Sequence, residues 1–342
     1  MEKNEEHQPS RLSAWRKTTP RLVILLAALA LPYLLGDEYY VHIAVKIGIW
    51  CIAVLGLGIL AGFTGQISLA QASFLGIGAY ASSLLALKAG FPFWGCIISA
   101  GIISALVGIL IGYPFLRLRG HYFAISTLAF CILMAHIFSN WVFLTAGPAG
   151  VTMGPGQVSG IPDASLPIPF VGHFVFDTKT SYYYLVLFFL FLAIYVMDRL
   201  LRSTAGRAFV AMREDEDLSR AVGIDPTRYK LFAFFLSAFF AGVSGSLYAH
   251  YVHFLSADSF NFLESFFILM AVIMGGKDSI PGLILGAIFI NLLPEFLSFP
   301  AAATMISALS MAILAVILVV IIIFLPGGLV DLGKLFRSKK RG

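Results

Sequence analysis

Long apolar runs follow one another along most of the chain, separated by short polar segments. The runs cover residues 22–35, 41–61, 66–87, 91–114, 122–144, 182–197, 231–252, 263–275, 282–298 and 304–325. A helix rises about 1.5 Å per residue, so about 20 apolar residues cross the ~30 Å hydrocarbon core of a bilayer. The pattern therefore predicts an all-α polytopic membrane protein with about ten transmembrane helices, in a domain over residues 22–330.

The first and eighth runs are short, and the pattern does not fix their ends. As a helix, residues 22–35 would rise only about 21 Å. Basic residues precede this run, so it also resembles the apolar core of a signal peptide. The small-residue triplet Ala28-Leu29-Ala30 lies within the run rather than after it. This favours a membrane span over a cleaved signal.

The basic residues predict the orientation of the spans. If the N-terminal tail (1–21) is cytoplasmic and ten spans alternate, all but three of the 23 Lys and Arg residues fall on the cytoplasmic side. The exceptions are Lys46, Lys88 and Lys179. Short cytoplasmic loops of membrane proteins carry an excess of Lys and Arg. Both termini, including the basic tail 331–342, are therefore expected to be cytoplasmic.

Composition supports the same class. The chain is 59% hydrophobic and 12% charged, whereas soluble proteins carry about 25% charged residues. This composition excludes a water-soluble globular protein and a disordered tail. It also means that the net charge of +5 does not indicate nucleic-acid binding. The three cysteines, Cys51, Cys96 and Cys131, are widely spaced within apolar runs. We interpret them as packing residues rather than as metal ligands or disulfide partners.

Two loops are long enough to carry structure of their own. Residues 145–181 are rich in Gly and Pro and are expected to form a periplasmic loop. Residues 198–230 are densely charged and are expected to be cytoplasmic. Within the second loop, residues 205–221 are good helix formers, with a Ser-Thr cap before them and Gly223 and Pro226 after them. This predicts a single cytoplasmic helix.

Polar side chains gather where the third run begins. Candidate residues for a translocation path are Gln66, Ser68, Gln71, Ser73 and Tyr80. In one helix, Gln66, Ser73 and Tyr80 would share nearly one face. Amides are costly in hydrocarbon, so these groups must face other helices or a wet cavity. Interhelical hydrogen bonding and a translocation path both remain open.

The remaining motifs do not assign a chemical function to the chain. Small residues at four-residue spacing, such as Gly108/Gly112 and Gly282/Gly286, predict close helix packing. Lys46, Glu264 and Glu295 lie near span ends, where their side chains could snorkel to water. The sequence contains no nucleotide-binding, catalytic or metal-ligand motif. Energy for transport would come from a partner, unless the protein is a passive channel.

Three segments resemble permeases of branched-chain amino acid ABC importers of the LivM type. They are GFTGQISLAQASFLGIGAYASSLLAL (62–87), GRAFVAMREDEDLSRAVGIDPTRYKLFAFFLSAFFAGVSGSLYAHYV (206–252) and FILMAVIMGGKDSIPGLILGAIFI (267–290). The resemblance implies an inner-membrane permease that pairs with a second permease, usually a different one. It also implies two cytoplasmic ATPase subunits, which bind the ATP, and a periplasmic substrate-binding protein. The permease itself needs no cofactor.

The resemblance further implies that residues 198–230 dock on the ATPase. Candidate coupling residues are Phe209, Met212, Arg213, Glu214, Asp215, Glu216 and Gly223. We expect Phe209 and Met212 to enter a groove on the ATPase. The acidic run 214–217 is denser than the usual family pattern. A helix that merely lies solvated on the membrane is the alternative.

The resemblance leaves the substrate open within the family. Branched-chain amino acids are expected, and urea, short amides or aromatic acids are the alternatives. Outside the family, a passive channel or an ion-coupled carrier would have the same number of spans. Neither of these needs a docking helix, so the long charged loop favours the ABC permease.

Overall fold

The computed structural model describes residues 28–33, 36–118, 120–147, 150–152, 165–168, 172–175, 178–277 and 279–298. The longer helices are α2 (Glu38–Leu57), α3 (Gln71–Ala89), α4 (Phe93–Phe115), α5 (His121–Asn140), α7 (Lys179–Arg202), α10 (Pro226–Val252), α11 (Phe262–Gly275) and α12 (Ile280–Ser298). The short ones are α6 (Val142–Thr145), α8 (Thr204–Glu214) and α9 (Glu216–Ala221), with a π-helical turn η1 (Gly58–Phe63) and a 3₁₀ turn η3 (Ala257–Phe260).

The helices coincide with the second to ninth apolar runs of the sequence. Seven helical segments in the described part are long and apolar enough to cross a membrane, and an eighth, over residues 280–295, is shorter. Residues 28–33 of the first run are helical. The run 304–325 and both tails lie outside the described residues. A helical, multi-pass membrane protein is therefore confirmed, whereas ten spans with cytoplasmic termini stay a prediction.

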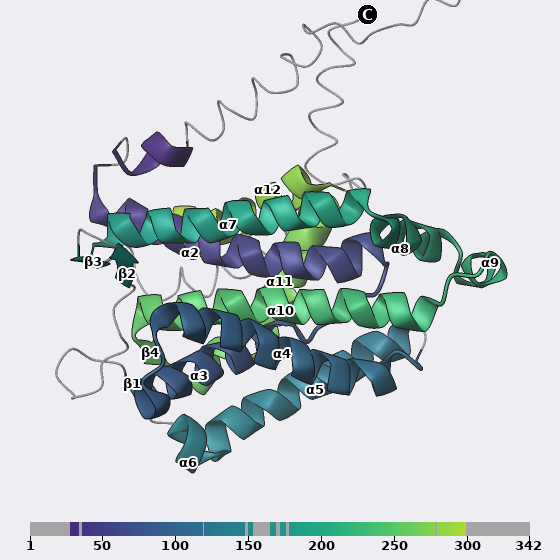
Figure 1. Ribbon diagram of the computed structural model, residues 1–342, viewed down its shortest axis with the longest axis horizontal. Helices are drawn as coiled ribbons and strands as arrows, with labels where there is room; N and C mark the ends of the chain where they lie inside the picture. Colours follow the sequence, from purple (N-terminus) through teal and green to yellow (C-terminus); the bar gives the residue numbers. More distant parts are fainter. Residues whose placement is uncertain are drawn as a thin grey trace, which may run out of the picture.

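Four short strands accompany the helices at one end of the bundle. β1 (Val151–Thr152) pairs with β4 (Phe254–Leu255), and β2 (Ser165–Ile168) pairs with β3 (Gly172–Val175), both antiparallel. The β2–β3 pairing falls within the predicted periplasmic loop, and β1 of that loop pairs with β4 outside it, so the expectation of a purely helical chain is corrected there. Figure 1 shows these strands at one end and α8 and α9 projecting at the other. We call the two ends the strand end and the α8 end.

Side-chain contacts agree with this two-ended arrangement. At the strand end, Lys179 at the start of α7 forms an ion pair with Glu38 at the start of α2, at 2.9 Å. At the α8 end, Arg213 of α8 bonds to Gly62 of η1, which also lies against the backbone of Lys277. The loops of the described chain thus alternate between two ends, as spans crossing a membrane require.

The third run departs from its expected helix. Helix α3 begins at Gln71 rather than at residue 66, and residues 64–70 form a non-helical segment. Gly65 at its start has φ +73°, a conformation that glycine adopts without strain. The Gln71 side chain bonds to the carbonyl of Ala53, well back along α2. The segment therefore runs from the α8 end back into the bundle, where such backbone is tolerated only inside protein or beside a cavity.

Helix α10 is the centre of the bundle and packs against α2, α3 and α4. Figure 1 shows these helices side by side along the long axis. Glycines permit the close contacts: a Cβ on Gly78 would overlap the backbone of Gly242, and a Cβ on Gly286 would overlap the carbonyl of Ala271. A Cβ on Gly108 would lie 2.8 Å from that of Ala238. Close packing at small residues is thus confirmed.

We expect Gly245→Ala to destabilise the protein. A Cβ at this position of α10 would overlap the carbonyl of Leu75 on α3, so the two backbones would have to separate. Overpacking of this kind costs about 1–3 kcal/mol. Gly95→Ala is the matched control, because its nearest neighbour would lie at 3.3 Å and alanine favours the helix. Thermal unfolding in detergent should give a lower midpoint for Gly245→Ala only, and equal midpoints would contradict the packing.

Candidate coupling segment and translocation path

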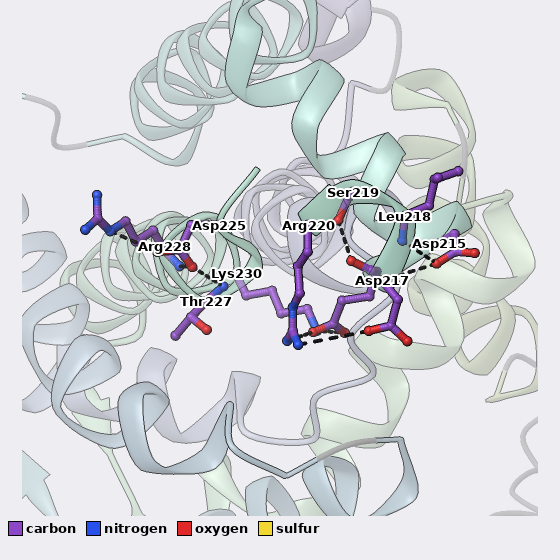
Figure 2. Close-up of polar contacts among 10 residues, drawn as sticks. Asp215, Asp217, Leu218, Ser219, Arg220, Asp225, Thr227, Arg228 and Lys230 are labelled. Atoms are coloured by element: carbon purple, nitrogen blue, oxygen red, sulfur yellow. Dashed lines mark hydrogen bonds and ion pairs between the residues drawn. The ribbon is translucent and has the colours of Figure 1, made fainter. Parts of the chain in front are cut away.

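The charged segment between α7 and α10 folds into two helices instead of one. The Ser203 hydroxyl accepts a hydrogen bond from the Gly206 N–H at 3.4 Å, and this begins α8. Asp215 is extended (φ −155°, ψ 113°), and its carboxylate accepts the N–H groups of Asp217 and Leu218, both at 2.9 Å. Figure 2 shows the two contacts of Asp215. The prediction of one helix over 205–221 is wrong at Asp215, because its carboxylate caps a new helix.

The end of this segment matches the expectation from sequence. Gly223 has φ +87°, the left-handed conformation that ends a helix. Pro226 is the first residue of α10, and Asp225 before it accepts the N–H groups of Thr227 and Arg228 at 3.1 and 3.4 Å (Figure 2). The predicted stop at Gly223 and Pro226 is confirmed. It also serves as the start of the next spanning helix.

The apolar face of α8 points into the chain. Phe209 is fully buried and Met212 is 4% exposed. The Phe209 ring lies 6.3 Å from the rings of Tyr229 and Phe232 on α10. This differs from the expectation that Phe209 and Met212 enter a groove on a partner. The apolar side chains left on the outer surface are those of Val210, Leu218 and Val222, exposed by 41%, 63% and 70%.

Ion pairs fasten α9 to the rest of the chain. Glu216 accepts from Lys230 of α10 at 2.5 Å and from Arg220 at 2.8 Å (Figure 2). Lys230 is 6% exposed, so its pairing with Glu216 is shielded from water. Asp217, by contrast, is largely exposed. The acidic run therefore divides into groups that hold the fold and groups that face outward.

Arg213 connects α8 to the broken end of α2. Its guanidinium donates to the carbonyl of Gly62 at 3.0 Å, and its aliphatic stem lies over Gly65. It also pairs with Glu214, which is mostly exposed, at 3.1 Å. Gly62 and Gly65 bound the turn from which the non-helical segment 64–70 enters the bundle. Arg213 is thus a direct contact between α8 and the start of that segment.

The candidate path residues do not share one helix face. Gln66 and Ser68 precede α3, so the predicted alignment of Gln66 with Ser73 and Tyr80 is wrong. Ser68 is buried and bonds to the Ala70 N–H at 3.3 Å. Gln71 is also buried and bridges α2 and α10, donating to the Ala53 carbonyl at 2.9 Å and accepting from the Ser237 hydroxyl at 3.1 Å. Gln71 therefore forms interhelical hydrogen bonds.

Ser73 and Tyr80 are different, because their hydroxyls are buried without a partner. Among the described residues these are the two buried side-chain oxygen or nitrogen atoms that lack a hydrogen bond. The Tyr80 ring lies between Phe138 of α5 and Phe260 of η3, at 4.8 and 5.9 Å. An unpaired buried hydroxyl costs about 1–3 kcal/mol. This face of α3 is the part of the predicted path that the structure leaves available for a polar partner.

A cavity of about 310 Å³ lies between α2, α3, η3, α11 and α12. Its lining includes Lys46 of α2, Glu264 of α11 and Glu295 of α12. Their positions near span ends predicted side chains that snorkel to water, but in the structure all three residues line one cavity. Charged residues within spans are energetically costly and commonly functional. This rule could have identified the three residues as site candidates from the sequence.

Comparison with known proteins assigns the family. The family model "Branched-chain amino acid transport system / permease component" matches residues 39–322. The LivM permease protein of the high-affinity branched-chain amino acid transport system of Salmonella typhimurium is 35% identical over 326 residues, which cover 91% of this chain and 74% of that protein. LivM of Escherichia coli K12 is 35% identical over 94% of this chain and 76% of its own length.

A second permease of the same system is a more distant relative. LivH of Escherichia coli K12 is 24% identical over 79% of this chain and 89% of that protein. No solved structure gives a significant match. The family match extends from the start of α2 past the end of α12. It includes the cavity and the charged segment 198–230, which we call the candidate coupling segment or, for short, the coupling segment. The chain belongs to the family of permease components of branched-chain amino acid transport systems.

Proposed function

We propose that this chain is one permease subunit of an ABC importer that moves leucine, isoleucine and valine across the bacterial inner membrane. Its partners are a second permease of the LivH kind, two ATPase subunits and a periplasmic binding protein. The α8 end is cytoplasmic and the strand end periplasmic. The similarity to LivM and LivH supports the transported class and the second permease.

The coupling segment is the observation that carries the proposal. Its outer surface presents Leu218 and Val222 beside the exposed carboxylates of Glu214 and Asp217. Its inner surface is fixed to α10 through Lys230 and to the end of η1 through Arg213. A passive channel has no use for such an arrangement. An ATPase that moves this segment would move the non-helical segment 64–70 with it.

Uptake in cells tests the proposed function. In a bacterium without endogenous branched-chain amino acid uptake, the chain expressed with its second permease, ATPases and binding protein should restore leucine uptake. Omission of the ATPase subunits should abolish it, because the permease sequence contains no nucleotide-binding motif. Excess urea or an aromatic acid should not compete with labelled leucine. Uptake without the ATPases would instead indicate a channel, and competition by urea would assign a different substrate.

A further inference from the structure

The cavity between α2, α3, η3, α11 and α12 contains opposite charges that are not paired with each other. Lys46 and Glu264 both line this cavity. Neither side chain makes a hydrogen bond or ion pair within the described part of the chain. Glu295 is held differently, since its carboxylate accepts the hydroxyl of Tyr39 at 2.7 Å. The cavity therefore has one ammonium and two carboxylates, one of which also accepts the Tyr39 hydroxyl.

The remaining wall is mostly apolar, with aliphatic residues and the aromatic residues Trp50, Tyr248, Phe260 and Phe267. Ile43 and Ile47 come from α2, Ile268 from α11 and Ile290 from α12. The volume of about 310 Å³ is at the lower end of the range for small-molecule sites. Ala72, in the first turn of α3, also borders the cavity. The cavity thus extends to the helix start that follows the non-helical segment 64–70.

We propose that this cavity binds a zwitterionic α-amino acid with an aliphatic side chain, as a site within the permease itself. The inference rests on the proposed function and adds a location to it. The Lys46 ammonium binds the ligand's carboxylate, the Glu264 carboxylate binds its ammonium, and the isoleucines contact its side chain.

The charges of the cavity favour a ligand that carries both signs of charge. A simple anion would lie against the carboxylates of Glu264 and Glu295, and a simple cation would lie against the ammonium of Lys46. Glutamate or lysine would bring an additional charge against the isoleucines. Urea would neutralise neither group. A zwitterion presents one charge of each sign, which matches a cavity lined by both an ammonium and a carboxylate.

Cysteine protection tests the site directly. Asn291 lines the cavity, and Asn291→Cys is made with the three native cysteines replaced by alanine. The assembled transporter, without ATP or binding protein, is treated with a membrane-impermeant methanethiosulfonate. Millimolar leucine should slow the labelling by about ten-fold, and glutamate should not. Ala89→Cys, exposed at the strand end, is the control whose labelling leucine leaves unchanged.

Transport by charge variants provides the second measurement. Lys46→Met and Glu264→Gln should each lower the maximal rate of leucine uptake by about ten-fold and abolish leucine protection, while the complex still assembles. Lys46→Arg, which keeps the charge, should retain protection. Glu38→Gln, which removes an exposed carboxylate at the strand end, is the control for transport.

The outcomes separate the site from the proposed function. Equal protection by leucine and glutamate, or wild-type uptake in both charge variants, would overturn the site while leaving the importer intact. Wild-type complex that takes up no branched-chain amino acid would overturn the proposed function, whatever the protection experiment gives.

Discussion

Replacing Leu218 and Val222 together by aspartate should abolish co-purification of the ATPase subunits with the permease. Both side chains are mostly exposed on the outer surface of the coupling segment. Burial of each at an interface would contribute about 1.5–3 kcal/mol. Removal of both predicts a loss of affinity of about 100-fold or more, since 1.4 kcal/mol corresponds to about ten-fold. The measurement is the amount of ATPase recovered with a tagged permease.

The control is Leu118→Asp, which adds a charge to an exposed leucine in another loop at the same end. It should leave co-purification unchanged. Recovery of normal amounts of ATPase with the double variant would show that this surface is solvated and does not dock. Phe209→Asp is unsuitable for this purpose, because Phe209 is fully buried within the chain and its loss would damage the fold.

Arg213→Met should separate ATPase docking from transport. The variant keeps an apolar stem over Gly65 but removes the hydrogen bond from the guanidinium to the Gly62 carbonyl. A hydrogen bond from a charged donor contributes about 1.5–3 kcal/mol. We expect transport to fall by about ten-fold or more, with co-purification of the ATPase retained, because α8 would no longer move the segment 64–70. Leucine uptake and ATPase stimulation by the liganded binding protein are measured in vesicles.

Arg207→Met is the matched control, since Arg207 is exposed on the same helix. It should transport at the wild-type rate. If Arg213→Met also transports normally, the contact with Gly62 only stabilises the fold. The coupling route would then have to pass through the pairing of Glu216 with Lys230.

The sequence predicted the spanning helices well but misplaced the start of α3. A spanning helix depends on local properties, namely apolar side chains and backbone hydrogen bonds within one segment. Residues 41–61 and 231–252 therefore correspond to α2–η1 and α10 with small shifts at their ends. The start of α3 depends on a distant contact instead, because Gln71 bonds to α2 and α10. No pattern within residues 62–87 indicates where the helix begins.

The coupling segment shows the same division. The cap at Ser203 and the stop at Gly223 follow from residue type and were readable in sequence. The direction in which the Phe209 side chain points could not be read from the sequence. An amphipathic helix does not indicate whether its apolar face packs against its own chain or against a partner. Contact with Tyr229 and Phe232 of α10 decides this.

By itself the sequence determined the class of protein, the helical spans and the location of the charged segment 198–230, because each follows from local composition and helix geometry. Only the tertiary structure decided that Lys46, Glu264 and Glu295, which come from three helices, line one cavity. It also decided that Arg213 connects α8 to the break after α2. Contacts between residues far apart in the chain depend on tertiary packing, and no periodic pattern in the sequence indicates which residues will meet.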